Sequence, residues 1–216
     1  MPEVKLIFED NNGIARTTDA RTPEYGFESF GSFNGNNNDV SFLEEKQFPP
    51  YAPGQKAIYY PDGLGQVLKA GADIAVQIHY APIAADEWDQ STINFFFADD
   101  SEEVDRLVEQ DIFLPFQLPG SFFGFFIPPN VEKEFLGQWR MTQDISIMGI
   151  FPHAHLLGKE WEAWIEHTDG TKTNLISIPD WDFNWQSQYY FNKLIKAEKN
   201  AVIKARAVYD NTASNP

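Results

Sequence analysis

Two histidines spaced two residues apart are the strongest chemical signal in this chain. His153 and His155 flank Ala154 and directly follow the apolar run 145–151. In an extended strand, side chains at i and i+2 point to the same side, with Cα atoms about 6.6 Å apart at ~3.3 Å per residue. Imidazole suits zinc, copper, iron and nickel. The spacing therefore predicts that His153 and His155 bind one transition-metal ion.

The alternative for this pair is two histidines at the rim of a strand end. Pro152 favours a strand end or bulge at this point, since proline cannot donate to a sheet ladder. The chain contains only four histidines, so a same-side pair favours the ligand interpretation.

His79 lies on a second predicted strand. Residues 72–80 alternate between apolar and polar side chains, which predicts a strand with His79 on the face opposite Ile74, Val76 and Ile78. This position points His79 towards solvent or a cleft, where it could be hydrogen-bonded. His167 stands beside a predicted hairpin turn, and we expect it to be exposed to solvent.

Several other residues have chemistry that could serve a metal site. Met141 and Met148 carry thioethers, but we expect Met148 to fill the core. Asp180, Asp182 and Asp210 could accept the second N–H of a ligating imidazole. Turn formation is the favoured role for each of these carboxylates. We expect the cluster at 185–189 to be core.

Composition and charge exclude several function classes. The 216 residues include 43% hydrophobic and 15% aromatic side chains, enough for a sizeable core, and the formal net charge is −16. That charge argues against nucleic acid, because phosphate binding needs a basic face, and it disfavours an anionic membrane surface. No apolar run approaches the ~20 residues that span a bilayer. Without cysteine there is no thiolate ligand, disulfide or cysteine nucleophile.

Many short strands separated by Gly, Pro and Asn turns predict an all-β fold of the sandwich or jelly-roll kind. Asp169-Gly170 is a strong hairpin signal, and a short helical turn is predicted over 104–108. A Pro- and Gly-broken segment at 111–130 predicts two domains, residues 1–117 and 118–216. The expected strands cover 6–8, 72–80, 91–98, 161–167, 172–178, 183–191 and 202–209.

The order of the motifs resembles a known family. Residues 153–159 are similar to the His-x-His-x-x-Gly-Lys signature of the type II, ascorbate-dependent copper monooxygenases, the group of peptidylglycine α-hydroxylating and dopamine β-monooxygenases with their bacterial relatives. Further similar segments cover nearly the whole chain in the expected order: 26–31, 76–80, 89–91, 182–186 and 209–216.

The resemblance implies two jelly-roll β-sandwich domains packed side by side, each with one copper ion. His153 and His155 would bind the oxygen-activating copper, and His79 would bind the electron-transfer copper. The implied reaction hydroxylates a C–H bond of a small organic substrate with O₂ and an ascorbate-type reductant. The implied location is periplasmic or secreted.

Three positions depart from the family pattern. Residues 3–5 stand where an adjacent His-His pair is expected, and the chain ends at Pro216, upstream of the expected Met ligand. We therefore expect the 216 residues alone not to turn over. Phe151 replaces the Arg that grips a peptide carboxylate in the amidating members, which argues against a peptide C-terminus as substrate.

Two other functions remain open. A non-catalytic binding module on the same fold would recognise a glycan or a protein partner through Phe and Trp surfaces. A glycosidase with paired carboxylates is less favoured, because no carboxylate pair stands out from the acidic background. The sequence leaves the oligomeric state open.

Overall fold

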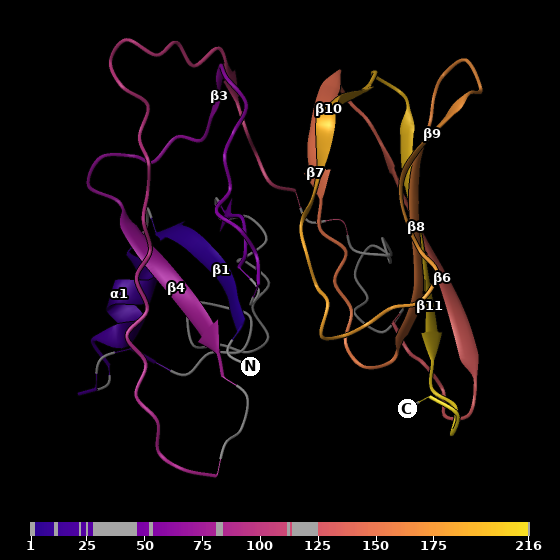
Figure 1. Ribbon diagram of the computed structural model, residues 1–216, viewed down its shortest axis with the longest axis horizontal. Coiled ribbons are helices and arrows are strands. Elements are labelled where there is room, and N and C mark those ends of the chain that lie inside the picture. Colours follow the sequence, from indigo (N-terminus) through magenta and orange to yellow (C-terminus); the bar gives the residue numbers. More distant parts are fainter. Residues whose placement is uncertain are drawn as a thin grey trace. The chain divides into compact units, whose positions relative to one another are not determined.

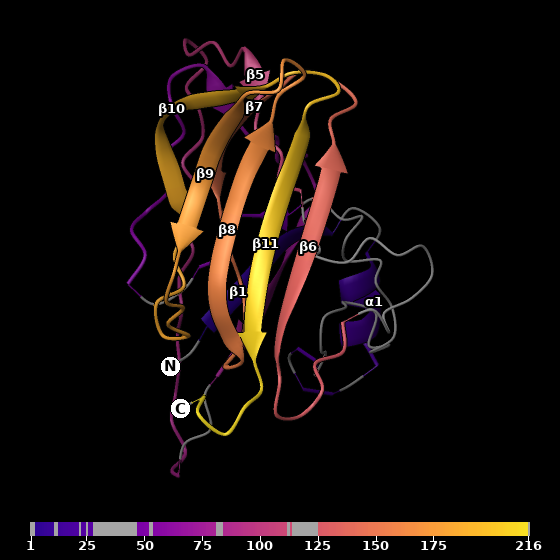
Figure 2. The same cartoon turned by 90° about the vertical axis from the view of Figure 1, so that its right-hand side faces the viewer.

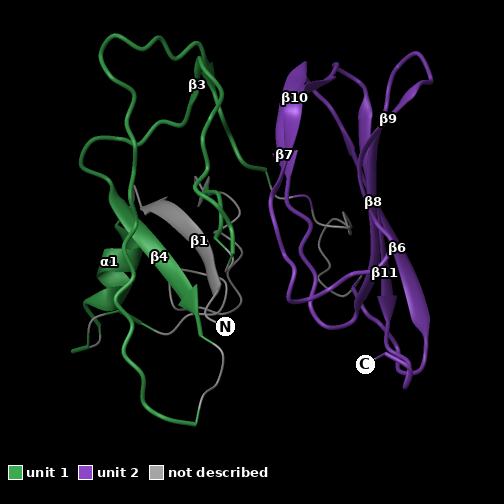
Figure 3. Cartoon of the chain, in the orientation of Figure 1, with its two compact units in different colours: residues 1–112 green, residues 113–216 purple. Residues whose placement is uncertain are grey.

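The computed structural model divides the chain into two compact units, residues 1–112 and 113–216 (Figure 3). The structure describes residues 3–10, 13–21, 23–24, 26–27, 47–51, 54–80, 84–111, 113 and 125–215. The domain boundary expected after residue 117 lies outside these residues, and so does most of the predicted loop motif at 26–31.

The fold is all-β, as the sequence predicts. The first unit contains a three-stranded antiparallel sheet in the order β2-β1-β4 and a short parallel pair, β3-β5. Its elements are β1 (Glu3–Asp10), α1 (Ile14–Asp19), β2 (Gln47–Phe48), β3 (Leu64–Gly65), β4 (Asp73–His79) and β5 (Arg106–Leu107). In the described parts of the chain, no helix is long and apolar enough to cross a membrane.

The second unit contains two sheets. Figure 1 shows β7 and β10 in one layer and the other four strands in a second layer, and Figure 2 shows that second sheet face on. The larger sheet is antiparallel in the order β6-β11-β8-β9, so the last strand lies between two earlier ones. The strands are β6 (Glu132–Arg140), β7 (Ile145–Ile150), β8 (Gly158–Glu166), β9 (Lys172–Ile178), β10 (Tyr189–Ala197) and β11 (Val202–Asp210).

Apolar side chains from both sheets form the main core of the second unit. Ile165 of β8 is fully buried, and partly buried Ile147 and Ile195 of β7 and β10 pack against the cluster that contains it. A second cluster contains Phe135, Ala154 and Tyr209. Because Ala154 separates the two histidines, this second cluster anchors the segment that carries them.

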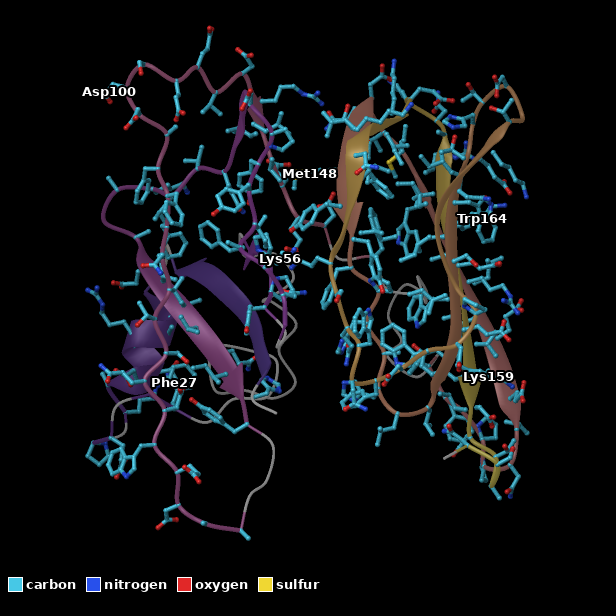
Figure 4. The ribbon with its side chains drawn as sticks, viewed as in Figure 1. Phe27, Lys56, Asp100, Met148, Lys159 and Trp164 are labelled. Carbon is cyan, nitrogen blue, oxygen red and sulfur yellow. The ribbon has the colours of Figure 1, made fainter. Side chains whose placement is uncertain are left out.

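The opposite face of the large sheet carries charges. Arg206 of β11 donates to Glu134 of β6 at 2.6 Å and to Glu160 of β8 at 3.0 Å. Figure 4 shows Lys159 and Trp164 at different heights along β8, with Lys159 nearer the C-terminus. The alternation of buried and charged positions explains why the period-two pattern predicts these strands well.

The predicted strands over 6–8, 72–80, 172–178 and 202–209 match β1, β4, β9 and β11, and the hairpin at Asp169-Gly170 joins β8 to β9. Three other predictions are wrong. Residues 91–98 form no strand, and no described strand pairs with them. Residues 104–108 contain β5 instead of a helical turn, and a turn occupies 182–185 before β10 begins at Tyr189. The sequence reading missed α1.

Candidate metal centre

The loop between β7 and β8 brings the two histidine rings together. The ring centroids of His153 and His155 are 5.2 Å apart, and the ring planes are nearly perpendicular at 84°. Pro152 and Ala154 are buried, whereas His153 is half-buried and His155 is exposed. This alternation is what an extended segment at i and i+2 produces. The pair thus lies at the surface, with its backbone anchored from below.

Gln186 holds the His153 ring. The Nδ1 atom of His153 lies 2.6 Å from Oε1 of Gln186, and Gln186 is 7% exposed. The Gln186 amide is itself held, because its Nε2 donates to the carbonyl oxygen of Phe183 at 3.0 Å. A metal-ligating histidine characteristically donates its other ring N–H to an acceptor of this kind.

Aromatic rings border both imidazoles. Phe151 stacks on His153 with centroids 6.2 Å apart, and Phe183 meets His155 edge-on at the same separation. Phe183 is 36% exposed and Trp185 is 69% exposed. Apolar surroundings of this kind lower the local dielectric around a bound ion and limit access of solvent.

Gly158 explains the shape of the histidine loop. Its N–H donates to the carbonyl of His155 at 2.9 Å and closes a tight turn. A Cβ at position 158 would lie 2.8 Å from both the Ala154 Cβ and the Trp181 Cδ1. Such contacts are shorter than van der Waals packing permits, so only glycine allows Ala154 and Trp181 to approach β8 at this point.

The C-terminal segment clasps the same turn. The N–H of Asp210 donates to the carbonyl of Leu157 at 2.8 Å. The Asn215 side chain donates to the carbonyls of Asp210 at 2.8 Å and Leu156 at 3.3 Å. Asn211 donates to the carbonyls of Ile127 and Pro128, which ties a further segment to β11. Residues 209–215 therefore hold the histidine loop in place.

Two of the candidate carboxylates, those of Asp182 and Asp210, hold turns. Asp182 accepts the backbone N–H of Asn184 at 2.8 Å, and Asp210 accepts that of Thr212 at 2.8 Å. Hydrogen bonds from Thr212 lower the pKa of Asp210. Lys159 pairs with Glu132, which raises the pKa of that lysine. These contacts give Asp182 and Asp210 the turn-forming role favoured from the sequence.

His79 lies in the first unit, as the last residue of β4. It is half-buried, and the strand register places the backbone of Glu3 opposite it. Within the described residues, no three His, Cys, Asp or Glu side chains gather into a metal-binding group.

The expectation that His167 faces solvent is wrong. Its Nδ1 lies 2.8 Å from Glu198 Oε2, and its Nε2 lies 2.8 Å from the Thr173 hydroxyl. These bonds tie the β8–β9 hairpin to the end of β10. Met141 is buried in the main core at 8% exposure, and Met148 is half-buried on β7.

The sequence reading missed Gln186 as a partner of the histidines and placed it in a core cluster with Trp185. Gln186 is buried, but Trp185 is exposed. The sequence did contain one signal for Gln186, the turn-forming composition of residues 182–184. Asp and Asn favour a turn after Trp181, and this turn brings the side chain of Gln186 inward. Nothing local linked Gln186 to a histidine 33 residues earlier.

The sequence matches no protein-family model and none of the curated proteins with which it was compared.

Proposed function

We propose that this protein is a copper-dependent oxidoreductase of the type II, ascorbate-dependent monooxygenase kind, built on two jelly-roll domains. The observation that carries the proposal is the pair of imidazoles 5.2 Å apart, one of them held through Nδ1 by a buried glutamine. Neutral imidazole nitrogens are ligands that copper accepts readily.

His153 and His155 would hold the ion, and the surrounding residues prepare them for it. Gln186 orients the first ring, while Phe151 and Phe183 place apolar surface against both rings. The ion, when bound, supplies the one-electron chemistry that O₂ and an ascorbate-type reductant require. His79 is the proposed ligand of a second copper in the first unit, with the location of the protein periplasmic or secreted.

A small organic molecule is the proposed substrate. Phe151 offers no charge for a peptide carboxylate, so a substrate recognised through a carboxylate at that position is disfavoured. The exposed rings of Phe183 and Trp185 provide apolar surface at the exposed histidine. They would contact the apolar part of the substrate and exclude water from the ion.

A Cu(II) titration followed by electron paramagnetic resonance tests the proposal. The wild-type protein is expected to bind near one equivalent with nitrogen ligands, and ascorbate should abolish the Cu(II) signal by reducing the ion. His153→Ala and His155→Ala should each remove the stoichiometric site. A wild-type protein without stoichiometric binding, or variants that bind as it does, would contradict the proposal.

A non-catalytic binding module is the second candidate function. Exposed aromatic side chains of the first unit favour it, since Trp88 is 98% exposed and Phe96 is 83% exposed. Such surfaces are typical of sites for glycans or protein partners. This candidate predicts ligand binding that is insensitive to chelators and lost in Trp88→Ala, with no effect of His153→Ala.

A further inference from the structure

Gln186 determines which nitrogen of His153 carries the proton. A glutamine side chain has one acceptor oxygen and one NH₂ donor group. The NH₂ group donates to the carbonyl of Phe183 at 3.0 Å, which leaves Oε1 facing His153 Nδ1 at 2.6 Å. The opposite orientation would set two acceptor oxygens against each other at Phe183. Because Oε1 cannot donate, Nδ1 of His153 must be the donor.

The turn before Gln186 fixes the position of the Phe183 carbonyl. The carbonyl of Asp182 accepts the N–H of Trp185 at 3.0 Å, and its carboxylate accepts the N–H of Asn184 at 2.8 Å. The turn is fastened to β8, because the N–H of Trp181 donates to the carbonyl of Lys159 at 2.9 Å. A rigid backbone therefore dictates the orientation of the Gln186 amide.

We infer that Gln186 is a positioning residue that locks neutral His153 in the Nδ1–H tautomer, so that the lone pair lies on Nε2 and this atom is the metal donor. In an unconstrained neutral histidine the Nε2–H tautomer is the commoner one. The lock removes the need to move a proton between ring nitrogens before an ion binds. This inference deepens the proposed function and rests on it for the identity of the ligand.

Nitrogen-15 NMR of the histidine side chains tests the tautomer in the metal-free protein at a pH where the rings are neutral. Four histidines give a spectrum simple enough to assign with one His→Ala variant for each. Wild-type His153 should show the Nδ1–H pattern. Gln186→Leu, which has no acceptor, should shift His153 towards the Nε2–H form.

Gln138→Leu is the matched control. Gln138 lies exposed on β6, and its replacement should leave the His153 tautomer unchanged. Circular dichroism and the urea midpoint establish that each variant is folded. The nitrogen-15 NMR spectrum of each folded variant is then compared with that of the wild-type protein. An Nε2–H tautomer in wild type, or an unchanged Nδ1–H tautomer in folded Gln186→Leu, would overturn the inference.

Metal affinity separates this inference from the proposed function. Removing a partner of this kind weakens metal binding about 10–100-fold. Gln186→Leu should therefore raise the Cu(II) dissociation constant by that factor, with Gln138→Leu unchanged. An equal affinity in both variants would contradict the role of Gln186 in metal binding. A locked tautomer in a wild-type protein that binds no copper would support the lock and refute the proposed function.

Discussion

The candidate histidines of this chain stand in two kinds of local structure, a loop and the end of a strand. The loop with His153 and His155 is fixed by Gln186, by the close packing at Gly158 and by hydrogen bonds from Asp210 and Asn215. His79 stands at the end of a strand whose neighbour across the sheet is Glu3. The comparison teaches that a loop needs contacts from distant segments to keep two side chains together, whereas a strand end is positioned by its neighbour in the sheet.

The buried side chains of the second unit gather into two clusters. One contains Ala154 of the histidine loop, and the other contains the fully buried Ile165 of β8. We therefore expect changes in the second unit to affect metal binding and stability together.

Metal binding should give the largest contrast. Cu(II) at a hundredfold excess over its dissociation constant should raise the free energy of unfolding of the wild-type protein by about 2.7 kcal/mol. His153→Ala should lose this stabilisation, and His79→Ala should keep it. Urea unfolding of each variant with and without Cu(II) measures the effect. Equal losses in both variants would remove the distinction between the sites.

Gly158→Ala should produce the next largest effect. The added Cβ meets Ala154 and Trp181 at 2.8 Å, so the loop or the tryptophan must move. Overpacking of this kind costs about 1–3 kcal/mol, measurable by urea unfolding. Ala154→Gly in the same chain removes one of the two clashes and should restore part of the stability. A fully stable Gly158→Ala variant would show that the turn has room to spare.

Asn215→Ala should have a smaller effect. It removes two hydrogen bonds to the carbonyls of Asp210 and Leu156, at about 1 kcal/mol each or less. Its Cu(II) affinity should also fall, since the turn that carries His155 loosens. Asn192→Ala, at an exposed position on β10, is the matched control for both measurements. If the two variants behave alike, the clasp does not support the histidines.

The smallest effect should appear only in acid. Hydrogen bonds, first from the Thr168 backbone and then from His167, lower the pKa of Glu198 from 4.5 to about 2. Because the folded pKa lies below the unfolded value, this stabilisation is fully present above pH 4.5 and is lost as the pH falls towards 2. Glu198→Gln should thus lower the urea midpoint at neutral pH and flatten its decline on acidification.

Glu162→Gln provides the control for the acid experiment. Glu162 lies exposed on β8, where its carboxylate is 3.9 Å from Arg206 on the charged face of the sheet. Its replacement should preserve the pH profile of the wild-type protein. A Glu198→Gln profile that is parallel to wild type at every pH would show that this carboxylate contributes nothing to the hairpin.

Periodicity and turn chemistry predicted much of the fold. The alternation in 72–80 and 202–209 and the Asp169-Gly170 turn are local signals, and β4, β9 and β11 follow them. The strand predicted over 91–98 was wrong because a strand also needs a pairing partner, and the local sequence does not show whether one is present. For the same reason the register of Glu3 against His79 could not be derived from either segment alone.

For the candidate site, the two-residue spacing of His153 and His155 predicted that their rings lie close together. It did not predict the residues that hold the loop in place. Gln186, Trp181 and Asn215 reach the loop from segments 23 or more residues away in sequence, through a turn and through the last strand. Such long-range contacts depend on the topology of the sheet. The same reason explains why His167 was expected in solvent, since its partner Glu198 is 31 residues away.

The position of β11 has a consequence for biosynthesis. This strand follows both β6 and β8 in sequence, yet it lies between them and is followed by the residues that clasp the histidine loop. On the ribosome, β6 and β8 emerge first and have no partner at their inner edges until residues 202–215 follow. A nascent chain therefore presents His153 and His155 well before their scaffold exists, and the histidine loop can take its final form only after residues 202–215 have been synthesised.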